Sequence, residues 1–314
     1  MSFSGKTKEE LARIDLGRDC CQLAELAALV RMDGTLQISA NRKMGLNVVT
    51  ESAAVARKIF KLAKVRLRVP VDIVVRRKLR LKKNNSYLVR IHALTENLLQ
   101  DLGLMNETLQ IRPGIKPELI KRQCCKKAYL RGAFLGGGSI NNPEGTYHLE
   151  IITNDENHAL GLCKLINNFD LGGKISPRKN WYVVYLKESE HIAEFLTLIG
   201  AHVALLEFEN VRVMKDMRNQ VNRLVNCETA NLSKTVDAAF RQMECIRAIQ
   251  ASLGLEKLDR PLREIAELRM LHPEISLKEL GELLIPKVGK SGVNHRMRKI
   301  EEIAGRLPGN PAHR

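Results

Sequence analysis

The sequence predicts an α+β protein in which a tandem, pseudo-two-fold pair of α+β units is followed by an all-α helix-turn-helix domain. Two observations support this fold class. Several features recur in the same order in the two halves of the region before about residue 210, as expected of an internal repeat. Near the C-terminus, a short capped helix is followed by a turn and a basic helix. The 314 residues suffice for two or three domains with cores of their own.

The repeat begins at two pairs of adjacent cysteines. Cys20-Cys21 precedes the segment LAELAALVRMDG, and Cys124-Cys125 precedes KKAYLRGAFLGGG. Three more pairs follow in the same order: LNVVTE from Leu46 and LEIITN from Leu149, YLVRI from Tyr87 and YVVYL from Tyr182, and apolar segments that end at Gly103 and Gly200. The offsets of 95 to 104 positions are too regular for chance.

Each unit is predicted to run helix, strand, strand, helix, strand, strand, helix. LNVVTE and LEIITN have the β-branched content of strands, and AAVARKIFKLA has apolar residues at helical spacing. A glycine just past a helix end suits the left-handed cap position. We therefore expect α+β units over residues 15–110 and 120–210, a partly helical linker over 211–232, and the helix-turn-helix domain over 233–306.

The net charge of +16 favours a polyanionic partner, either nucleic acid or an acidic membrane surface. No apolar run reaches the roughly 20 residues that span a bilayer. The N-terminal MSFSGKTKEE also lacks the order of a signal peptide. The sequence thus predicts a cytoplasmic protein that is not inserted in a membrane.

The seven cysteines show no C-x-x-C spacing and no cluster with histidine. Zinc sites are usually built from such spacings, so no metal site is expected. The odd number argues against a disulfide framework, and buried, reduced thiols are expected instead.

The glycine-rich stretch RGAFLGGGS, from Arg131 to Ser139, nearly matches a phosphate-binding loop. Such a loop needs a strand before the glycines and a helix after them, with a lysine that reaches the phosphates. Here the glycines end a predicted helix, and glycine stands in place of the lysine. Neither nucleotide binding nor any other cofactor is expected.

A helix-turn-helix is predicted from Ser276 onward. Ser276 and Glu279 form a capping box, and Pro286 stops the short helix SLKELGELL. After the turn, Ser291 is expected to cap the helix GVNHRMRKIEEIAGRL, whose N-terminal residues would contact base edges. The candidate DNA-binding residues are Ser276, Lys278, Lys287, Lys290, Ser291, Asn294, His295, Arg296, Arg298 and Lys299. A merely solvated charged face is the alternative.

A second basic region lies between Arg57 and Arg90, where Asp72 is the only acidic residue. RRKLRLKKNN alternates as a pair of strands would. Contacts to phosphates from this region would add affinity without sequence choice. The candidate phosphate contacts are Arg76, Arg77, Lys78, Arg80, Lys82 and Lys83. A surface that only aids solubility is the alternative.

Two segments resemble the LAGLIDADG homing endonucleases. LAALVRMDG, from Leu26 to Gly34, aligns with the nine-residue motif, and LRGAFLGGGS aligns with a common variant of it. The resemblance implies that the two helices pack through small residues, here Ala27, Ala28, Gly132 and Ala133. It also implies one metal-binding acid at the end of each helix. Asp33 stands at the first of these positions, but Gly137 stands at the second, so a scaffold without nuclease activity is expected.

The whole chain also resembles the WhiA family. The resemblance rests on MSFSGKTKEEL, RGAFLGGGSINNPEGTYHLEI, NRLVNCETANLSKTVDAA and SLKELGELL with GKSGVNHRMRKI. It implies a nucleoid-associated, DNA-binding transcription regulator in sporulation, cell division or chromosome segregation. Double-stranded DNA is the expected partner. Other regulatory proteins stay open as partners, and so does the oligomeric state, with a monomer favoured.

Two other functions stay open from the sequence. One is an active metal-dependent DNA endonuclease, against which Gly137 speaks. The other is an RNA-binding protein, against which the low aromatic content of 4% speaks, because single-strand binding surfaces stack bases on aromatic side chains.

Overall fold

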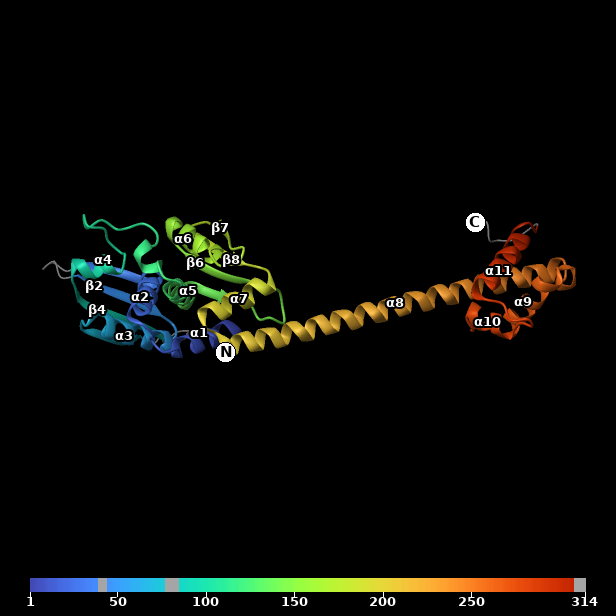
Figure 1. The fold of residues 1–314 in the computed structure, drawn as a ribbon, viewed down its shortest axis with the longest axis horizontal. Coiled ribbons are helices and arrows are strands. Elements are labelled where there is room, and N and C mark those ends of the chain that lie inside the picture. The colour runs from blue at the N-terminus through green and yellow to red at the C-terminus, as the bar shows by residue number, and fades with distance from the viewer. Residues whose placement is uncertain (39–43, 77–84, 308–314) are drawn as a thin grey trace. The chain divides into compact units, whose positions relative to one another are not determined.

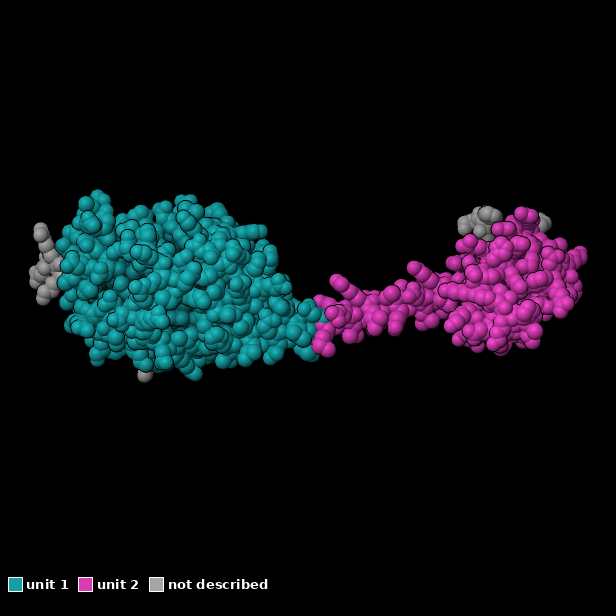
Figure 2. All heavy atoms as spheres, viewed as in Figure 1, with its two compact units in different colours: residues 1–216 teal, residues 217–314 magenta. Residues whose placement is uncertain are grey.

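The computed structural model describes residues 1–38, 44–76 and 85–307. The chain divides into two compact units, residues 1–216 and 217–314, which Figure 2 distinguishes by colour. Each unit has its own hydrophobic core. Within the described ranges, no helix combines the length and the apolar character that crossing a membrane requires.

The first unit contains the predicted repeat, with the predicted order of elements (Figure 1). The first copy comprises α2 (Asp19–Asp33), β1 (Gly34–Ile38), β2 (Met44–Thr50), α3 (Ala53–Leu67), β3 (Val71–Arg76), β4 (Ser86–Leu94) and α4 (Glu96–Asp101). The short helix η1 (Pro117–Ile120) follows. The second copy comprises α5 (Gln123–Gly137), β5 (Gly138–Ile140), β6 (Leu149–Thr153), α6 (Glu156–Asn167), β7 (Lys174–Arg178), β8 (Trp181–Leu186) and α7 (Ser189–Ile199).

The two sheets have the same topology. Their strand orders are β1-β2-β4-β3 and β5-β6-β8-β7, and the neighbouring strands are antiparallel. Val48 lies opposite Val89 in the first sheet, and Ile151 lies opposite Val184 in the second. All four side chains are buried, because helices α3 and α6 pack on their respective sheets. The pseudo-two-fold repeat is therefore present in the pairing of strands as well as in the sequence.

Helices α2 and α5 pack against each other at the junction of the two repeats (Figure 1). A Cβ on Gly132 would overlap the backbone oxygen of Glu25 and would lie 2.9 Å from the Cβ of Ala28. Ala27, Ala28 and Ala133 are buried. The predicted packing through small residues is confirmed, because only glycine at position 132 lets the two backbones approach so closely.

A buried ionic network spans the same helix pair. The carboxylate of Glu25, which is fully buried, lies 2.7 Å from Nη2 of Arg131 and 3.2 Å from Nζ of Lys58. Lys58 also donates hydrogen bonds to the carbonyl oxygens of Leu11 and Ile14. Burial lowers the pKa of Lys58, and the charge of Glu25 opposes that shift. Lys58 is thus a core residue, although it belongs to the basic region from Arg57 to Arg90.

Helix α1 (Phe3–Arg13) precedes the repeats and packs against α3, α5 and β5. The carboxylate of Glu10 accepts hydrogen bonds from the backbone N–H groups of Val203 (2.7 Å) and Ala204 (3.0 Å). These are two of the N–H groups that a helix start leaves without an internal partner. Helix α1 therefore stabilises the start of helix α8.

Residues 211–232, expected to be a partly helical linker, lie inside helix α8 (His202–Ser252). The boundary between the two compact units falls within this helix, between Asp216 and Met217. The segment contains neither glycine nor proline. Its asparagine-rich composition suggested a linker, but the absence of helix breakers permits a continuous helix.

The second unit consists of the end of α8, the short η2 (Leu255–Lys257), α9 (Arg260–Leu271), α10 (Leu277–Leu283) and α11 (Lys290–Gly305). Buried residues from all the α-helices form its core, among them Ile246, Ile265, Leu280 and Met297. The buried guanidinium of Arg269 donates a 2.7 Å hydrogen bond to the carbonyl oxygen of Ile275. This bond holds the loop that leads into α10.

Candidate nucleic-acid interface

Helix α10 begins with the predicted capping box. Oγ of Ser276 accepts a hydrogen bond from the backbone N–H of Glu279 at 3.3 Å, and a carboxylate oxygen of Glu279 accepts one from the N–H of Ser276 at 2.8 Å. The bond from Ser276 N–H lowers the pKa of Glu279, because it favours the charged carboxylate. The side chain of Ser276 is therefore engaged in capping the helix.

The turn between α10 and α11 is fixed by a close backbone contact. The N–H of Val288 donates a 3.0 Å hydrogen bond to the carbonyl oxygen of Gly281, and a Cβ on Gly281 would overlap the carbonyl oxygen of Val288. Glycine at position 281 thus allows the turn to return against α10. This contact sets the position of α11 relative to α10.

Helix α11 has one apolar side and one cationic side. Val293, Met297, Ile300 and Ala304 are buried at helical spacing in the core of the unit. Seven of the ten candidate DNA-binding residues are exposed: Lys278, Lys287, Lys290, Ser291, His295, Arg298 and Lys299. The other three, Ser276, Asn294 and Arg296, are half-buried.

The predicted cap at Ser291 is wrong. Helix α11 begins at Lys290, its N-cap residue is Gly289, and no side chain caps it. The backbone N–H groups of the first turn therefore lack a side-chain acceptor. Such a helix start attracts anions such as phosphate.

The scaffold offers a second cationic surface. The strand register places Arg76 opposite Ser86 and Asp72 opposite Arg90, so Arg76 and Arg90 share one face of the first sheet. Both arginines are exposed. On this face, Asp72 lies 2.9 Å from Nε2 of His92. The other candidate phosphate contacts, Arg77, Lys78, Arg80, Lys82 and Lys83, lie outside the described residues.

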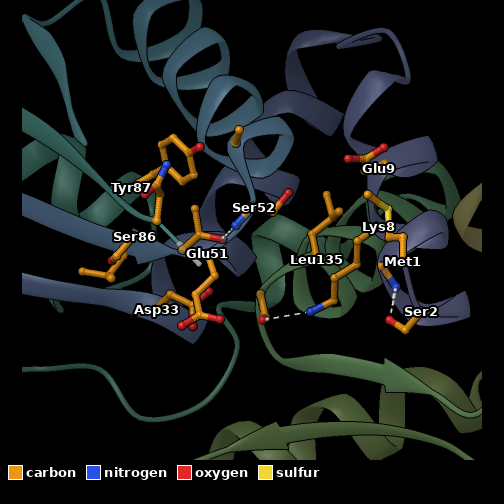
Figure 3. A pocket seen from close by; sticks show the side chains of 16 residues that line it. Met1, Ser2, Lys8, Glu9, Asp33, Glu51, Ser52, Ser86, Tyr87 and Leu135 are labelled. Carbon is orange, nitrogen blue, oxygen red and sulfur yellow. Dashed lines mark hydrogen bonds between the residues drawn. The ribbon is translucent and has the colours of Figure 1, made fainter. Parts of the chain in front are cut away.

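Asp33 lines a pocket at the end of α2 (Figure 3). Helix α1 contributes Lys8 and Glu9, and Glu51 extends from the end of β2 toward Asp33 in the figure. Nζ of Lys8 donates a 3.4 Å hydrogen bond to the carbonyl oxygen of Gly136. The structure thus brings a lysine and further carboxylates to Asp33.

Lys8 is the positive neighbour of Asp33 in this pocket. Burial raises the pKa of Asp33 to about 6, and Lys8 partly offsets this. Burial also lowers the pKa of Lys8, against the attraction of Asp33. An ammonium group on Lys8 would compete with a metal cation for the carboxylate of Asp33.

The position that would supply the second metal-binding acid is closed. A Cβ on Gly137 would overlap Cε of Met32 and the carbonyl oxygen of Ile152, so no side chain fits there. Asp155 is another carboxylate of the second repeat, but it is engaged elsewhere. It pairs with Arg31 at 3.4 Å and accepts a hydrogen bond from the N–H of Asn157. The residues around Asp33 therefore do not fit the pair of catalytic metal ions that the nuclease resemblance would imply.

The cysteines were expected to be buried, reduced thiols without a metal site, but Cys227 is exposed and four of the others lie close together. The Sγ atoms of Cys20, Cys21, Cys124 and Cys125 all lie within 4.8 Å of one another, and we call them the four-cysteine cluster. The spacing argument missed it because the two pairs come from different repeats. The repeat itself was a signal for this cluster, since equivalent residues of two repeats can meet at the pseudo-two-fold axis that relates them.

Together, these features define a class: a two-repeat scaffold of LAGLIDADG type whose metal-binding acids are incomplete, followed by a helix-turn-helix domain. Three family models together match most of the chain. They are the WhiA N-terminal LAGLIDADG-like domain over residues 19–105, the WhiA LAGLIDADG-like domain over 126–218 and the WhiA C-terminal HTH domain over 221–304. The chain belongs to the WhiA family.

Curated relatives agree with this assignment. The probable cell division protein WhiA of Desulfitobacterium hafniense is 70% identical over 307 residues, which cover 98% of this chain and 96% of the relative. That of Heliobacterium modesticaldum is 61% identical over 306 residues, which cover 97% and 96%.

A solved structure supports the fold. The crystal structure of full-length WhiA from Thermatoga maritima is 28% identical, covers 98% of this chain and 99% of its own, and gives a TM-score of 0.60. The N-terminal LAGLIDADG domain of WhiA, solved separately, is 26% identical and gives a TM-score of 0.52 over 63% of this chain and 90% of its own.

Proposed function

We propose that this protein is a sequence-specific, DNA-binding transcription regulator that acts in cell division, sporulation or chromosome segregation and does not cleave DNA. The observation that carries the proposal is the cationic face of α11. The capped helix α10 and the fixed turn that follows it set the position of this face. Arginine pairs with guanine and asparagine with adenine in the major groove. The relatives are named probable cell division protein WhiA, which supports the role in division.

Within α11 we assign base contacts to Arg298 and His295, which are exposed, and to Asn294 and Arg296 at the edges of the same face. Lys287, Lys290 and Lys299 are assigned to phosphates, since a lysine ammonium binds a phosphate as a point charge. Arg76 and Arg90 would add phosphate contacts from the scaffold. The protein would then act in the cytoplasm, at the nucleoid.

Duplex DNA is expected to be the preferred nucleic acid. The test measures the dissociation constants of the full chain for duplex DNA, duplex RNA and single-stranded DNA of one sequence, over a series of salt concentrations. We expect duplex DNA to bind most tightly, with log K falling by about 0.9 per phosphate contact for each unit of log salt. Tighter binding to RNA would favour an RNA-binding protein instead.

No cleavage of duplex DNA is expected with Mg²⁺ or Mn²⁺, because Asp33 lacks a partner acid at position 137 and faces Lys8. Plasmids and a genomic library are incubated with the full chain and each metal, beside the Asp33→Ala variant. Specific double-strand cuts by the wild type that vanish in Asp33→Ala would contradict the proposal. Glu51, which lines the same pocket, would then be the first candidate for the second acid.

A further inference from the structure

The four-cysteine cluster lies where α2 and α5 begin. Each cysteine pair belongs to the first turn of its helix, at equivalent positions of the two repeats. The Sγ atoms within each pair are 4.0 Å apart, and the full set lies within 4.8 Å. Cys21 and Cys125 are buried, while Cys20 and Cys124 are half-buried. The cluster is therefore compact and partly shielded from solvent.

The spacing suits a single metal ion. Four thiolates around a tetrahedral Zn²⁺, with Zn–S bonds of about 2.3 Å, stand roughly 3.8 Å from one another. The sulfurs of the cluster need only small side-chain movements to reach that arrangement. An iron–sulfur cluster fits less well, because its iron and sulfide atoms lie between the thiolates and hold them further apart.

Positive groups lie near the sulfurs. The N-cap residues of α2 and α5 are Arg18 and Arg122, and neither side chain caps its helix. The N-terminus of a helix carries positive potential, which favours thiolates in the first turn. Nη1 of Arg122 also lies 3.9 Å from Sγ of Cys20. These groups would partly neutralise the double negative charge of a Zn²⁺ with four thiolates.

We propose that the four-cysteine cluster is a structural site for one thiophilic divalent ion, Zn²⁺, which links the two repeats at the start of α2 and α5. As the ion binds, each thiol releases its proton to solvent and its sulfur forms one bond to the metal, so no electron is transferred. All four positions of the ion are filled by protein, which is the pattern of a structural zinc site rather than a catalytic one.

The site is independent of the pocket at Asp33. Helix α2 has 15 residues, so its two ends are about 20 Å apart at 1.5 Å per residue. The ion would stabilise the pair of helices from the end opposite to Asp33. Loss of the site is therefore expected to lower the stability of the scaffold without creating or removing a nuclease centre.

The test measures metal in the full chain, purified under reducing conditions without chelator. We expect about one zinc per chain, as for a four-thiolate structural site. After exchange with Co²⁺, the wild type should show sulfur-to-cobalt charge-transfer absorption and the intense visible bands of a tetrahedral four-sulfur site. The Cys20→Ser/Cys124→Ser double variant, which changes the two half-buried ligands, should lose the zinc.

The matched control is Cys227→Ser, which changes an exposed cysteine outside the cluster and should keep the zinc. The proposal is wrong if the wild type holds no stoichiometric zinc and gives no cobalt–thiolate bands. It is also wrong if the double variant keeps its metal, or if peptide mapping of the reduced preparation finds a disulfide within the cluster. The absorption spectrum of the cobalt-exchanged wild type tests the proposal even if a variant does not fold.

Discussion

At the scale of single residues, Asp33 is the position where the scaffold departs from a nuclease. Its pKa in the folded chain is about 6, raised from 3.8 by burial. Between pH 3.8 and pH 6, Asp33 therefore keeps its proton in the folded state but loses it in the unfolded state. Stability from this group is fully present below pH 3.8 and is lost as the pH rises through 6.

Asp33→Asn is accordingly expected to increase the free energy of unfolding at pH 7 by about 1–2 kcal/mol, and to have little effect near pH 4. Urea unfolding of both proteins at the two pH values measures this difference. Asp216→Asn makes the same change of charge on an exposed part of α8 and should shift stability much less. Equal effects of Asp33→Asn at both pH values would contradict the assigned burial.

Sequence reasoning identified Asp33 and its missing partner at Gly137, because both stand at fixed places in a repeated motif. It could not identify Lys8 as the neighbour of Asp33, since α1 lies outside the repeat and its packing is a tertiary effect. The same limit hid the burial of Lys58, whose partner Glu25 is 33 positions away in the sequence. The zinc ligands proposed above were missed because two distant pairs had to meet.

At the scale of elements, the α2–α5 packing is the feature on which the scaffold depends. Gly132→Ala places a methyl group against the backbone oxygen of Glu25, which cannot move without shifting α2. We expect this change to destabilise the protein by about 1–3 kcal/mol, the usual cost of overpacking a core. Denaturant unfolding of the full chain, followed by far-ultraviolet circular dichroism, measures the loss.

Gly145→Ala is the matched control for that change. The nearest atom to a Cβ at Gly145 is 3.5 Å away, an ordinary contact, so stability should stay nearly unchanged. If Gly132→Ala proved as harmless as Gly145→Ala, the close approach of α2 and α5 would be wrong.

The order of the helices and strands was predictable because β-branched segments, amphipathic stretches and glycine caps recur in the same order in both repeats. The capping box at Ser276 was predictable from two residues alone. Helix α8 was predicted only in part, because the polar composition of residues 211–232 resembled a linker although the segment contains no helix breaker. The start of α11 was also misplaced, since a serine near a helix start is a frequent N-cap but Gly289 takes that position here.

At the scale of the whole molecule, the proposed DNA binding is divided between two surfaces. The cationic face of α11 is assigned the choice of sequence, because its side chains suit base edges. Arg76 and Arg90 on the scaffold are assigned affinity without choice, because contacts to phosphates carry no direct sequence information. Both arginines are exposed, and they share one sheet face.

The measurement that tests this division most directly is the ratio of dissociation constants for two duplexes, one selected by the full chain from a random library and one scrambled. Arg298→Ala should weaken binding to the selected duplex by about 1–3 kcal/mol and so reduce the ratio. Arg76→Ala/Arg90→Ala should weaken both duplexes alike, and Arg260→Ala, an exposed arginine on α9, should change neither. If the ratio is kept in Arg298→Ala and lost in the scaffold variant, the scaffold reads the sequence and this division of DNA binding is wrong.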